Sequence, residues 1–413
     1  MNRRHLWFLS MAVPAALALG WADPAGAIDF PATGQTTSYP AEKNDHVSAP
    51  VAVPDDGAVQ AGATLSYTDN GDGTITDDNT GLMWEKKGDN GGLHDKDNGY
   101  VWTGTGTQET IWDWLDDVNA EGGTGFAGYD DWRVPNAKEL QTLVNFQNSP
   151  PMTSGAFNAN CVPGATVLTG SCTPVTGYTS STTWARSTGM AWGVSFYEGL
   201  LFPYDKTSGL RVRAVRGGLS GPLPATGQTT TYAANKNDGI PGAVTVPDDG
   251  TVQAGAPLSF TDNGNGTLTD DNTGLVWEKK GDNGGLHDKD NFYWWSGNGA
   301  DETIWDWLED VNAEAFAGRQ DWRIPNAREL LSIASFQNQW AVPAAFNNNC
   351  VPGATVLTGS CAFQSSYWTS TTRVSSVVGG TSIQAWYVDN YGSVYPYFKS
   401  GTFRVRAVRG GTP

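Results

Sequence analysis

The chain has 413 residues, enough for two ordinary domains, and its 43 acidic residues against 25 basic ones give a formal net charge of −18. An acidic surface repels nucleic acid, anionic lipid and sulfated polyanions at long range, so we expect none of these as partners. A solvated surface without a charged partner is the simplest explanation of this charge.

The N-terminus is typical of a secretory signal peptide. Two arginines at residues 3–4 precede an apolar run over residues 6–21, and Ala-Gly-Ala at 25–27 fits the small-x-small cleavage pattern. The alternative is an N-terminal membrane anchor, but the run is shorter than the ~20 residues of a membrane span. We predict removal of residues 1–27, no membrane insertion afterwards, and an exported protein in the periplasm, at the cell surface or outside the cell.

An internal repeat organises the rest of the chain. Residues 31–218 and 224–411 both begin with PATGQTT and end with RVRAVRGG. LSGPL at 219–223 joins them as a short linker. The period is far longer than that of a solenoid, so we predict two tandem domains, each large enough for its own core.

Each repeat starts with short strands. In LSYTDNGDGTITDDNTGLMW (65–84), turns at NGDG and DDNTG separate the strand-like stretches, because Asn-Gly and Asp-Gly accept a positive φ. DNGDGT also invites an EF-hand interpretation, but Thr68 would occupy the first ligand position and Asn79 that of the bidentate glutamate. We therefore predict a hairpin turn.

The string GDNGGLHDKDN occurs twice, at 88–98 and 281–291. Its oxygen donors suit Ca²⁺, and its histidines suit a ligand-facing loop. A third alternative is a plain turn whose Asn and Asp side chains bond their own backbone, with Lys96 as a local counter-charge. All three stay open. The candidate calcium ligands are Asp89, Asn90, Asp95, Asp97, Asp282, Asn283, Asp288 and Asp290, and the candidate ligand-binding histidines are His94 and His287.

Tryptophan is abundant, with 18 residues. Those at patterned positions, such as Trp114, are expected in the core. Trp102, Trp294 and Trp295 follow the Asp-rich loop without such a pattern, so they are candidates for ligand contact, since exposed aromatic rings stack on sugar faces. Burial in the core is the alternative.

Two helices are predicted in each repeat. Apolar residues recur at i, i+3, i+4 and i+7 over 111–118, and Asn136 with Glu139 forms a capping box for a second helix. Strand-like stretches follow at 191–199 and 211–216. The fold class is therefore α+β, loop-rich, with two main helices and several short antiparallel strands in each domain.

Arginines alternate along the last strand of the first repeat, at 211, 213 and 216. Structural ion pairing with the Asp-rich loops is the preferred interpretation. A platform for an anionic ligand is the alternative.

The four cysteines, Cys161, Cys172, Cys350 and Cys361, allow three pairings. Each repeat holds one CVPGATVLTGSC string, so we predict the local disulfides 161–172 and 350–361. Closing a loop of about 12 residues stabilises a fold by about 3 kcal/mol. Export makes oxidation plausible.

Several ordered motifs carry a family resemblance. DNGDGTITDDNTGLMW, DDWRVPNAKELQTLV, YTSSTTW, AWGVSF and RVRAVRGG follow one another as in the Legionella collagen-like protein C-terminal (Lcl C-terminal) domain family, and the second repeat has the same series. The resemblance implies two tandem C-type-lectin-like domains, a fold shared with formylglycine-generating enzymes. The best-known member of the family is a surface adhesin that binds sulfated glycosaminoglycans. This chain departs from it in its acidic charge and in having no Gly-X-Y collagen tract.

The function expected from the resemblance is that of an adhesin-like binding protein with a carbohydrate or protein ligand. A structural role in a surface layer or appendage is the alternative from another class. A formylglycine-generating-enzyme-like oxidase is a third, and it would need a reactive cysteine pair. No nucleophile, zinc-protease or phosphate-loop motif is present in the sequence, so we expect no enzyme.

Overall fold

The computed structural model describes residues 30–411 except 45–48, 220–222, 239–241, 339, 363, 375–376 and 379–380. The predicted signal peptide and most of the predicted linker lie outside the described residues. Within the described part of the chain, no helix is long and apolar enough to cross a membrane.

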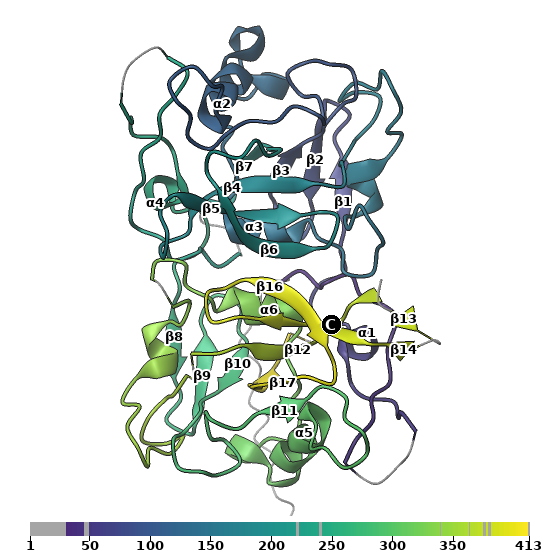
Figure 1. The fold of residues 1–413 in the computed structure, drawn as a ribbon, viewed down its shortest axis with the longest axis vertical. Coiled ribbons are helices and arrows are strands. Elements are labelled where there is room, and N and C mark those ends of the chain that lie inside the picture. The colour runs from purple at the N-terminus through teal and green to yellow at the C-terminus, as the bar shows by residue number, and fades with distance from the viewer. Residues whose placement is uncertain are drawn as a thin grey trace, which may run out of the picture.

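The two repeats follow nearly the same order of elements (Figure 1). The first contains α1 (Asp56–Val59), β1 (Tyr67–Asp69), β2 (Thr74–Asp77), β3 (Met83–Glu85), α2 (Ile111–Ala120), α3 (Ala137–Thr142), β4 (Gly177–Thr183), β5 (Met190–Ser195), β6 (Leu200–Asp205) and β7 (Val215–Arg216). The second contains α4 (Asp249–Val252), β8 (Phe260–Asp262), β9 (Thr267–Asp270), β10 (Val276–Glu278), β11 (Tyr293–Trp294), α5 (Ile304–Ala313), α6 (Ala327–Ser332), β12 (Tyr367–Thr372), β13 (Val377–Val378), β14 (Thr381–Ser382), β15 (Gln384–Val388), β16 (Val394–Phe398), β17 (Thr402–Phe403) and β18 (Val408–Arg409).

The predicted hairpin at DNGDGT is present, with β1 and β2 paired antiparallel on either side of the turn. Gly71 and Gly73 have φ of 77° and 97°, which other residues adopt only with strain. β3 and β7 complete a four-stranded sheet in the order β1-β2-β3-β7. The second repeat builds the equivalent sheet from β8, β9, β10 and β18.

The two main helices of each repeat lie where their patterns predict them. α2 buries Ile111, Trp114 and Val118 on one face, and Thr110 caps its first turn. Asn136 and Glu139 form the predicted capping box of α3. Because a capping box satisfies N–H groups that the helix itself leaves unpaired, it fixes the start of a helix as short as α3.

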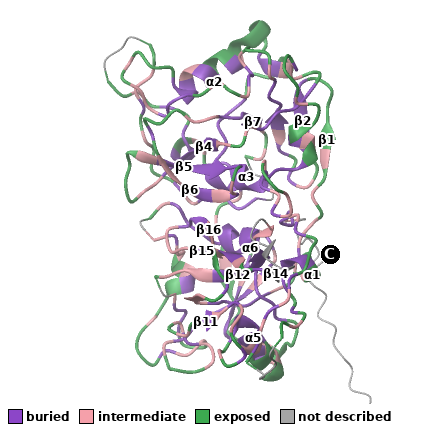
Figure 2. Cartoon of the chain, turned by 45° about the vertical axis from the view of Figure 1, so that its right-hand side comes forward, coloured by how far each residue is buried: buried purple, intermediate pink, exposed green. Residues whose placement is uncertain are grey.

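A six-stranded antiparallel sheet joins the two repeats, in the order β12-β15-β16-β6-β5-β4. The junction lies between β16 and β6, where Val394 pairs with Leu201. Residues of both repeats share one core behind this sheet, which includes Trp192 and Phe336 with ring centroids 4.8 Å apart. Buried residues gather on the central sheet, α3 and α6, whereas exposed residues gather near α2 and α5 at the outer ends (Figure 2).

Each repeat begins with a leading segment, residues 30–62 in the first and 224–256 in the second, and the short helix of each segment packs against the other repeat. α1 packs against β12 of the second repeat, and α4 packs against β4 of the first. The buried carboxylate of Asp56 accepts a hydrogen bond of 2.7 Å from Thr371, and that of Asp249 accepts an equivalent bond from Thr182. Each leading segment therefore completes the packing of the other repeat.

The architecture is thus a mixed α and β fold with mostly antiparallel strands and few helices, in two repeated halves. This confirms the predicted fold class at that level.

Candidate functional site

The repeated loop at 88–98 connects β3 to the segment before α2, and its side chains bond mainly to its own backbone. The carboxylate of Asp95 accepts N–H groups of Gly91 at 2.6 Å and Asp97 at 2.8 Å. Asn98 donates to the carbonyls of Gly92 and Leu93. Burial alone would raise the pKa of Asp95, but its backbone hydrogen bonds lower it below the usual value. These contacts are the Asx-turn chemistry of a demanding turn.

Three of the candidate calcium ligands in each loop lie close together, but the ammonium group of Lys96 lies between two of those in the first loop. Oxygen atoms of Asp89, Asp95 and Asp97 lie within 4.8 Å of one another, as do those of their second-repeat equivalents. Lys96 Nζ lies 3.2 Å from Asp89 and 2.6 Å from Asp97. The fourth candidate, Asn90, accepts the N–H of Gly92 through Oδ1. The donor set suits Ca²⁺, but an ion here would have to displace the ammonium group.

The second repeat has the same arrangement. Lys289 contacts Asp282 at 3.0 Å and Asp290 at 2.8 Å, Asn283 accepts the N–H of Gly285, and Asp288 anchors the turn. A pocket of about 450 Å³ lies beside this loop. Its lining includes the three aspartates and the exposed ring of Phe292, so a ligand-facing role of the loop stays a prediction.

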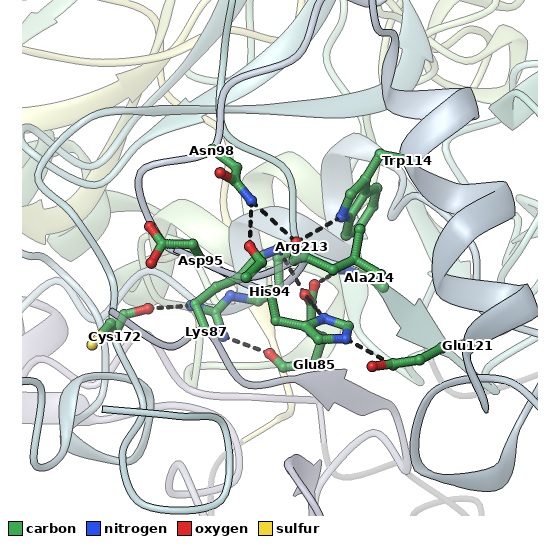
Figure 3. A network of polar contacts seen from close by, with 12 residues as sticks. Glu85, Lys87, His94, Asp95, Asn98, Trp114, Glu121, Cys172, Arg213 and Ala214 are labelled. Carbon is green, nitrogen blue, oxygen red and sulfur yellow. Dashed lines mark hydrogen bonds and ion pairs between the residues drawn. The ribbon is translucent and has the colours of Figure 1, made fainter. Parts of the chain in front are cut away.

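A buried charge network lies beneath the loop (Figure 3). The fully buried Glu85 of β3 accepts Lys87 Nζ at 2.7 Å, lies 2.7 Å from His94 Nδ1, and accepts the N–H of Ala214. His94 Nε2 lies 3.0 Å from Glu121 at the end of α2. Glu278, Lys280, His287 and Glu314 repeat this arrangement in the second half.

Contacts within the network shift the pKa values of Glu85 and His94 in opposite directions. Burial opposes ionisation of Glu85, but the charge of Lys87 and the bond to His94 lower its pKa to about 2. Burial would lower the pKa of His94, and the hydrogen bond and charge of Glu85 reverse this and raise it. His94 is 8% exposed and contacts a carboxylate at each ring nitrogen. The network therefore fastens the loop to β3 and α2.

Two of the three tryptophans that follow the loop, Trp102 and Trp295, are buried. Trp102 is 2% exposed and Trp295 fully buried, and Lys206 and Lys399 place Nζ 3.4 Å and 3.5 Å from the respective ring centroids. Trp294 is half-buried in β11. The leading segment of the other repeat contributes Ala234 and Val246 to the core around Trp102, and Ala41 and Val53 to that around Trp295. Neither ring offers a free face to a ligand.

Both predicted disulfides, Cys161–Cys172 and Cys350–Cys361, are present, and no cysteine is free.

The arginines of the last strand have different roles. Arg216 pairs with Asp131 at 2.7 Å, as the ion-pairing interpretation expects, whereas the buried Arg213 donates to the carbonyls of Glu85 and Cys172.

A row of aromatic rings that was not predicted from the sequence lies on the face of the six-stranded sheet opposite α3 and α6. We call it the aromatic strip; five of its rings, Tyr204, Phe202, Tyr395, Tyr387 and Tyr397, come from β6, β15 and β16, and the sixth, Phe403 of the separate strand β17, packs against Tyr387. Successive ring centroids from Tyr204 to Tyr397 lie 4.1, 6.1, 6.2 and 6.3 Å apart, and Phe403 lies 4.5 Å from Tyr387. Every ring is partly or largely exposed, Tyr397 at 47%. The strip crosses the β6–β16 junction and so belongs to both repeats.

A sequence signal for the strip exists in the alternation Phe-Pro-Tyr at 202–204 and Tyr-Pro-Tyr at 395–397. Side chains two apart on a strand share a face, but sequence does not show that the two strands pair. Gly193 makes room in the first half, since a Cβ there would lie 2.7 Å from the Tyr204 ring. Partly exposed rings can stack against apolar faces of a ligand while tyrosine hydroxyls form hydrogen bonds, although Tyr387 and Phe403 also pack against the core of the second repeat.

Comparison with known proteins gives one family. The family model described as the Lcl C-terminal domain matches residues 73–216 and 266–409, well over half of the chain. No curated protein matches.

Proposed function

Since the chain belongs to the Lcl C-terminal domain family and carries two tandem copies of its domain, we propose that it is a binding protein that acts outside the cytoplasm and holds a neutral carbohydrate chain. The observation that carries this proposal is the aromatic strip, a row of partly exposed rings that runs across both repeats. The C-type-lectin-like fold implied by the resemblance and an adhesin-like role belong to the same proposal.

The physical argument rests on the chemistry of sugar rings. A pyranose presents C–H groups on its faces and hydroxyls at its edge, so it stacks on an aromatic face and bonds to neighbouring polar groups. Four of the six rings of the strip are tyrosines, each with a hydroxyl. The net charge of −18 favours a neutral chain over a sulfated one. The two disulfides fit an oxidising compartment.

The test is affinity electrophoresis of the full chain in gels that contain soluble neutral polysaccharides, beginning with a β-glucan. We expect retardation by at least one glycan, and at least a tenfold loss of affinity in Tyr395→Ala/Tyr397→Ala. Tyr197→Ala is the matched control, because Tyr197 is 57% exposed and lies outside the strip. Equal losses in both variants, or no retardation by any neutral glycan, would contradict the proposal.

This proposal describes binding without catalysis. An oxidase of the formylglycine-generating type would use reactive thiols, and all four cysteines are paired in disulfides.

One observation favours the structural alternative. Each disulfide loop exposes two apolar side chains, Val162 and Leu168 in the first repeat and Val351 and Leu357 in the second, all at 58% exposure or more. Paired exposed apolar sites can link copies of a chain into an assembly. Sedimentation velocity decides between the two functions, because ordered oligomers that Leu168→Ser/Leu357→Ser dissolves would support the structural role.

A further inference from the structure

A pocket of about 470 Å³ in the second repeat is lined by two arginines. It lies where the hairpin of β8 and β9 meets β10, β18 and residues 317–322. Arg319 and Arg409 contribute its charge, and Asn263, Asn265 and Thr267 contribute polar groups. The volume is within the range of small-ligand sites.

The first repeat has different charges at the matching positions. Asn265 replaces Asp72, Arg319 replaces Tyr129 and Gln320 replaces Asp130, so each of three changes makes the second repeat one unit more positive. All three lie in the hairpin turn or the segment before Trp322, beside the pocket. On a chain of net charge −18, these changes concentrate positive charge in one place.

The changes also remove the aromatic ring that packs on the strand arginine, although the side chain of Arg409 is no more exposed than that of Arg216, at 16% against 22%. In the first repeat, the guanidinium carbon of Arg216 lies 3.7 Å from the ring centroid of Tyr129, so the ring covers it. Arg409 occupies the matching place in the second repeat and keeps the matching ion pair, with Asp321 at 3.1 Å. The residue matching Tyr129 is Arg319, which is exposed and forms no hydrogen bond or ion pair within the described part of the chain, although its charge acts on the nearby carboxylate of Asp321. Two guanidinium groups and one carboxylate leave a net charge of +1.

The replacement of Asp72 by Asn265 also gives the second repeat an additional hydrogen-bond donor. The carboxylate of Asp72 accepts the N–H and hydroxyl of Thr74 at 3.0 Å and 2.6 Å. In the second repeat, Asn265 Oδ1 accepts the hydroxyl of Thr267 at 2.7 Å. Its amide nitrogen has no partner among the described residues, so it can donate to a ligand.

We propose that this pocket binds a sugar residue that carries one carboxylate, such as a uronate, and that the second repeat alone has this site. Arg319, with support from Arg409, binds the carboxylate, since guanidinium groups match its two oxygens. The Asn265 amide bonds a ring hydroxyl, whereas Asn263 lines the pocket with its Nδ2 already donating to Thr267 and Thr269. A net charge of +1 suits one carboxylate, and the acidic surroundings repel a polyanion. The site is separate from the aromatic strip and goes beyond the neutral-glycan proposal.

The two repeats supply matched variants for the test. N265D/R319Y/Q320D gives the second repeat the residues of the first at the three positions where their charges differ, so the fold is expected to tolerate it. D72N/Y129R/D130Q makes the reciprocal change. Isothermal titration of the full chain with glucuronate is expected to show one equivalent bound to the wild type, at least tenfold weaker binding to the first variant and two equivalents bound to the second. Glucose, acetate and inorganic phosphate serve as comparison ligands.

Several results would overturn the proposal. They are no binding of glucuronate by the wild type, unchanged binding in N265D/R319Y/Q320D, or a stoichiometry of one in the reciprocal variant. If acetate or phosphate binds as tightly as glucuronate, the pocket recognises an anion and not an acidic sugar. Tyr395→Ala/Tyr397→Ala is expected to leave glucuronate binding unchanged, so failure at the aromatic strip and failure at this pocket are distinguishable.

Discussion

Val394 of β16 pairs with Leu201 of β6, and both side chains are fully buried. Through this pairing the sheet of one repeat continues into that of the other. The leading segments cross the same boundary, with Asp56 bonded to Thr371 and Asp249 to Thr182. A sequence repeat by itself therefore lacks part of its packing, because its leading segment covers the other repeat.

The first prediction concerns fragments of the chain. Residues 63–256 contain the body of the first repeat and the leading segment whose α4, Ala234 and Val246 pack on it, whereas residues 31–218 contain that body with a leading segment whose α1, Ala41 and Val53 pack on the second repeat. We expect the 63–256 fragment to show a cooperative thermal transition, and the 31–218 fragment to be less stable or to dimerise by exchange. Circular dichroism melts and sedimentation compare them. Equal stability of two monomeric fragments would contradict the exchanged packing.

The second prediction concerns the buried carboxyl groups that join the repeats. Burial raises the pKa of Asp56 and of Asp249 to about 7, and the threonine hydrogen bonds only partly offset it. Because the folded-state pKa lies above the unfolded value of 3.8, the folded state holds the proton more tightly. The resulting stability is complete below pH 3.8 and is lost as the pH rises through 7.

Asp56→Asn/Asp249→Asn removes this titration and keeps an oxygen that accepts the threonine hydroxyls. We expect a smaller Tm difference from the wild type at pH 5 than at pH 8.5, where the Tm of the variant is higher by roughly 4 °C or more. Asp117→Asn/Asp310→Asn, at exposed matching positions of α2 and α5, is the control and is expected to change little at either pH. A pH-independent Tm difference in the buried variant would show that these carboxyls do not titrate as described.

Local structure could be predicted from sequence, and contacts between distant segments could not. The DNGDGT hairpin, the apolar face of α2 and the Asn136 cap each depend on residues within a few positions of one another. Local pairing of Cys161 with Cys172 followed from an exact internal repeat.

The environment of Trp102 depends instead on segments far apart in the chain. Ala234 and Val246 cover the core around it, and they lie more than a hundred residues away. The aromatic strip likewise needs the pairing of β6 with β16, which no local pattern encodes. The two partners of His94 also lie on different elements, Glu85 on β3 and Glu121 at the end of α2, so the local sequence does not show that both contact the same imidazole ring.

The third prediction concerns the buried charge network. Glu85→Gln leaves the ammonium of Lys87 and the ring of His94 without their shared carboxylate. Loss of one partner of a buried ion pair typically costs about 3–5 kcal/mol, so we expect a loss of this size in the free energy of unfolding at pH 6. Glu121→Gln is the control, because this carboxylate is 43% exposed and its loss is expected to cost about 1 kcal/mol or less.

The stability that this network contributes is expected to fall both at low pH and at high pH. The pKa of Glu85 is lowered to about 2 from 4.5, so its contribution is complete above pH 4.5 and is lost as the pH falls toward 2. The pKa of His94 is raised above 6.5, so its contribution is complete below pH 6.5 and is lost as the pH rises through the folded-state value. Urea unfolding from pH 3 to 9 is expected to show the largest difference between wild type and Glu85→Gln between pH 4.5 and 6.5. A difference that stays constant from pH 3 to pH 9 would refute the assignment.

The last prediction concerns calcium at GDNGGLHDKDN. Lys96 contacts Asp89 and Asp97, and Lys289 contacts their equivalents, so each ammonium group occupies the place that an ion needs. We expect millimolar Ca²⁺ to leave the Tm of the chelated wild type unchanged. Lys96→Gln/Lys289→Gln removes these groups and leaves three carboxylates within 4.8 Å in each loop, a donor set that suits Ca²⁺.

In this variant Ca²⁺ is expected to raise the Tm, by the equivalent of roughly 3 kcal/mol per site at a hundredfold excess over Kd. Adding Asp97→Asn and Asp290→Asn should remove the effect, because each loop then loses a charged ligand. Mg²⁺ is the control ion, since it demands an octahedral geometry that a turn built on backbone hydrogen bonds does not supply. A rise in Tm of the wild type with Ca²⁺ would show that the ion displaces the lysine, and would make this loop a calcium site as well as a turn.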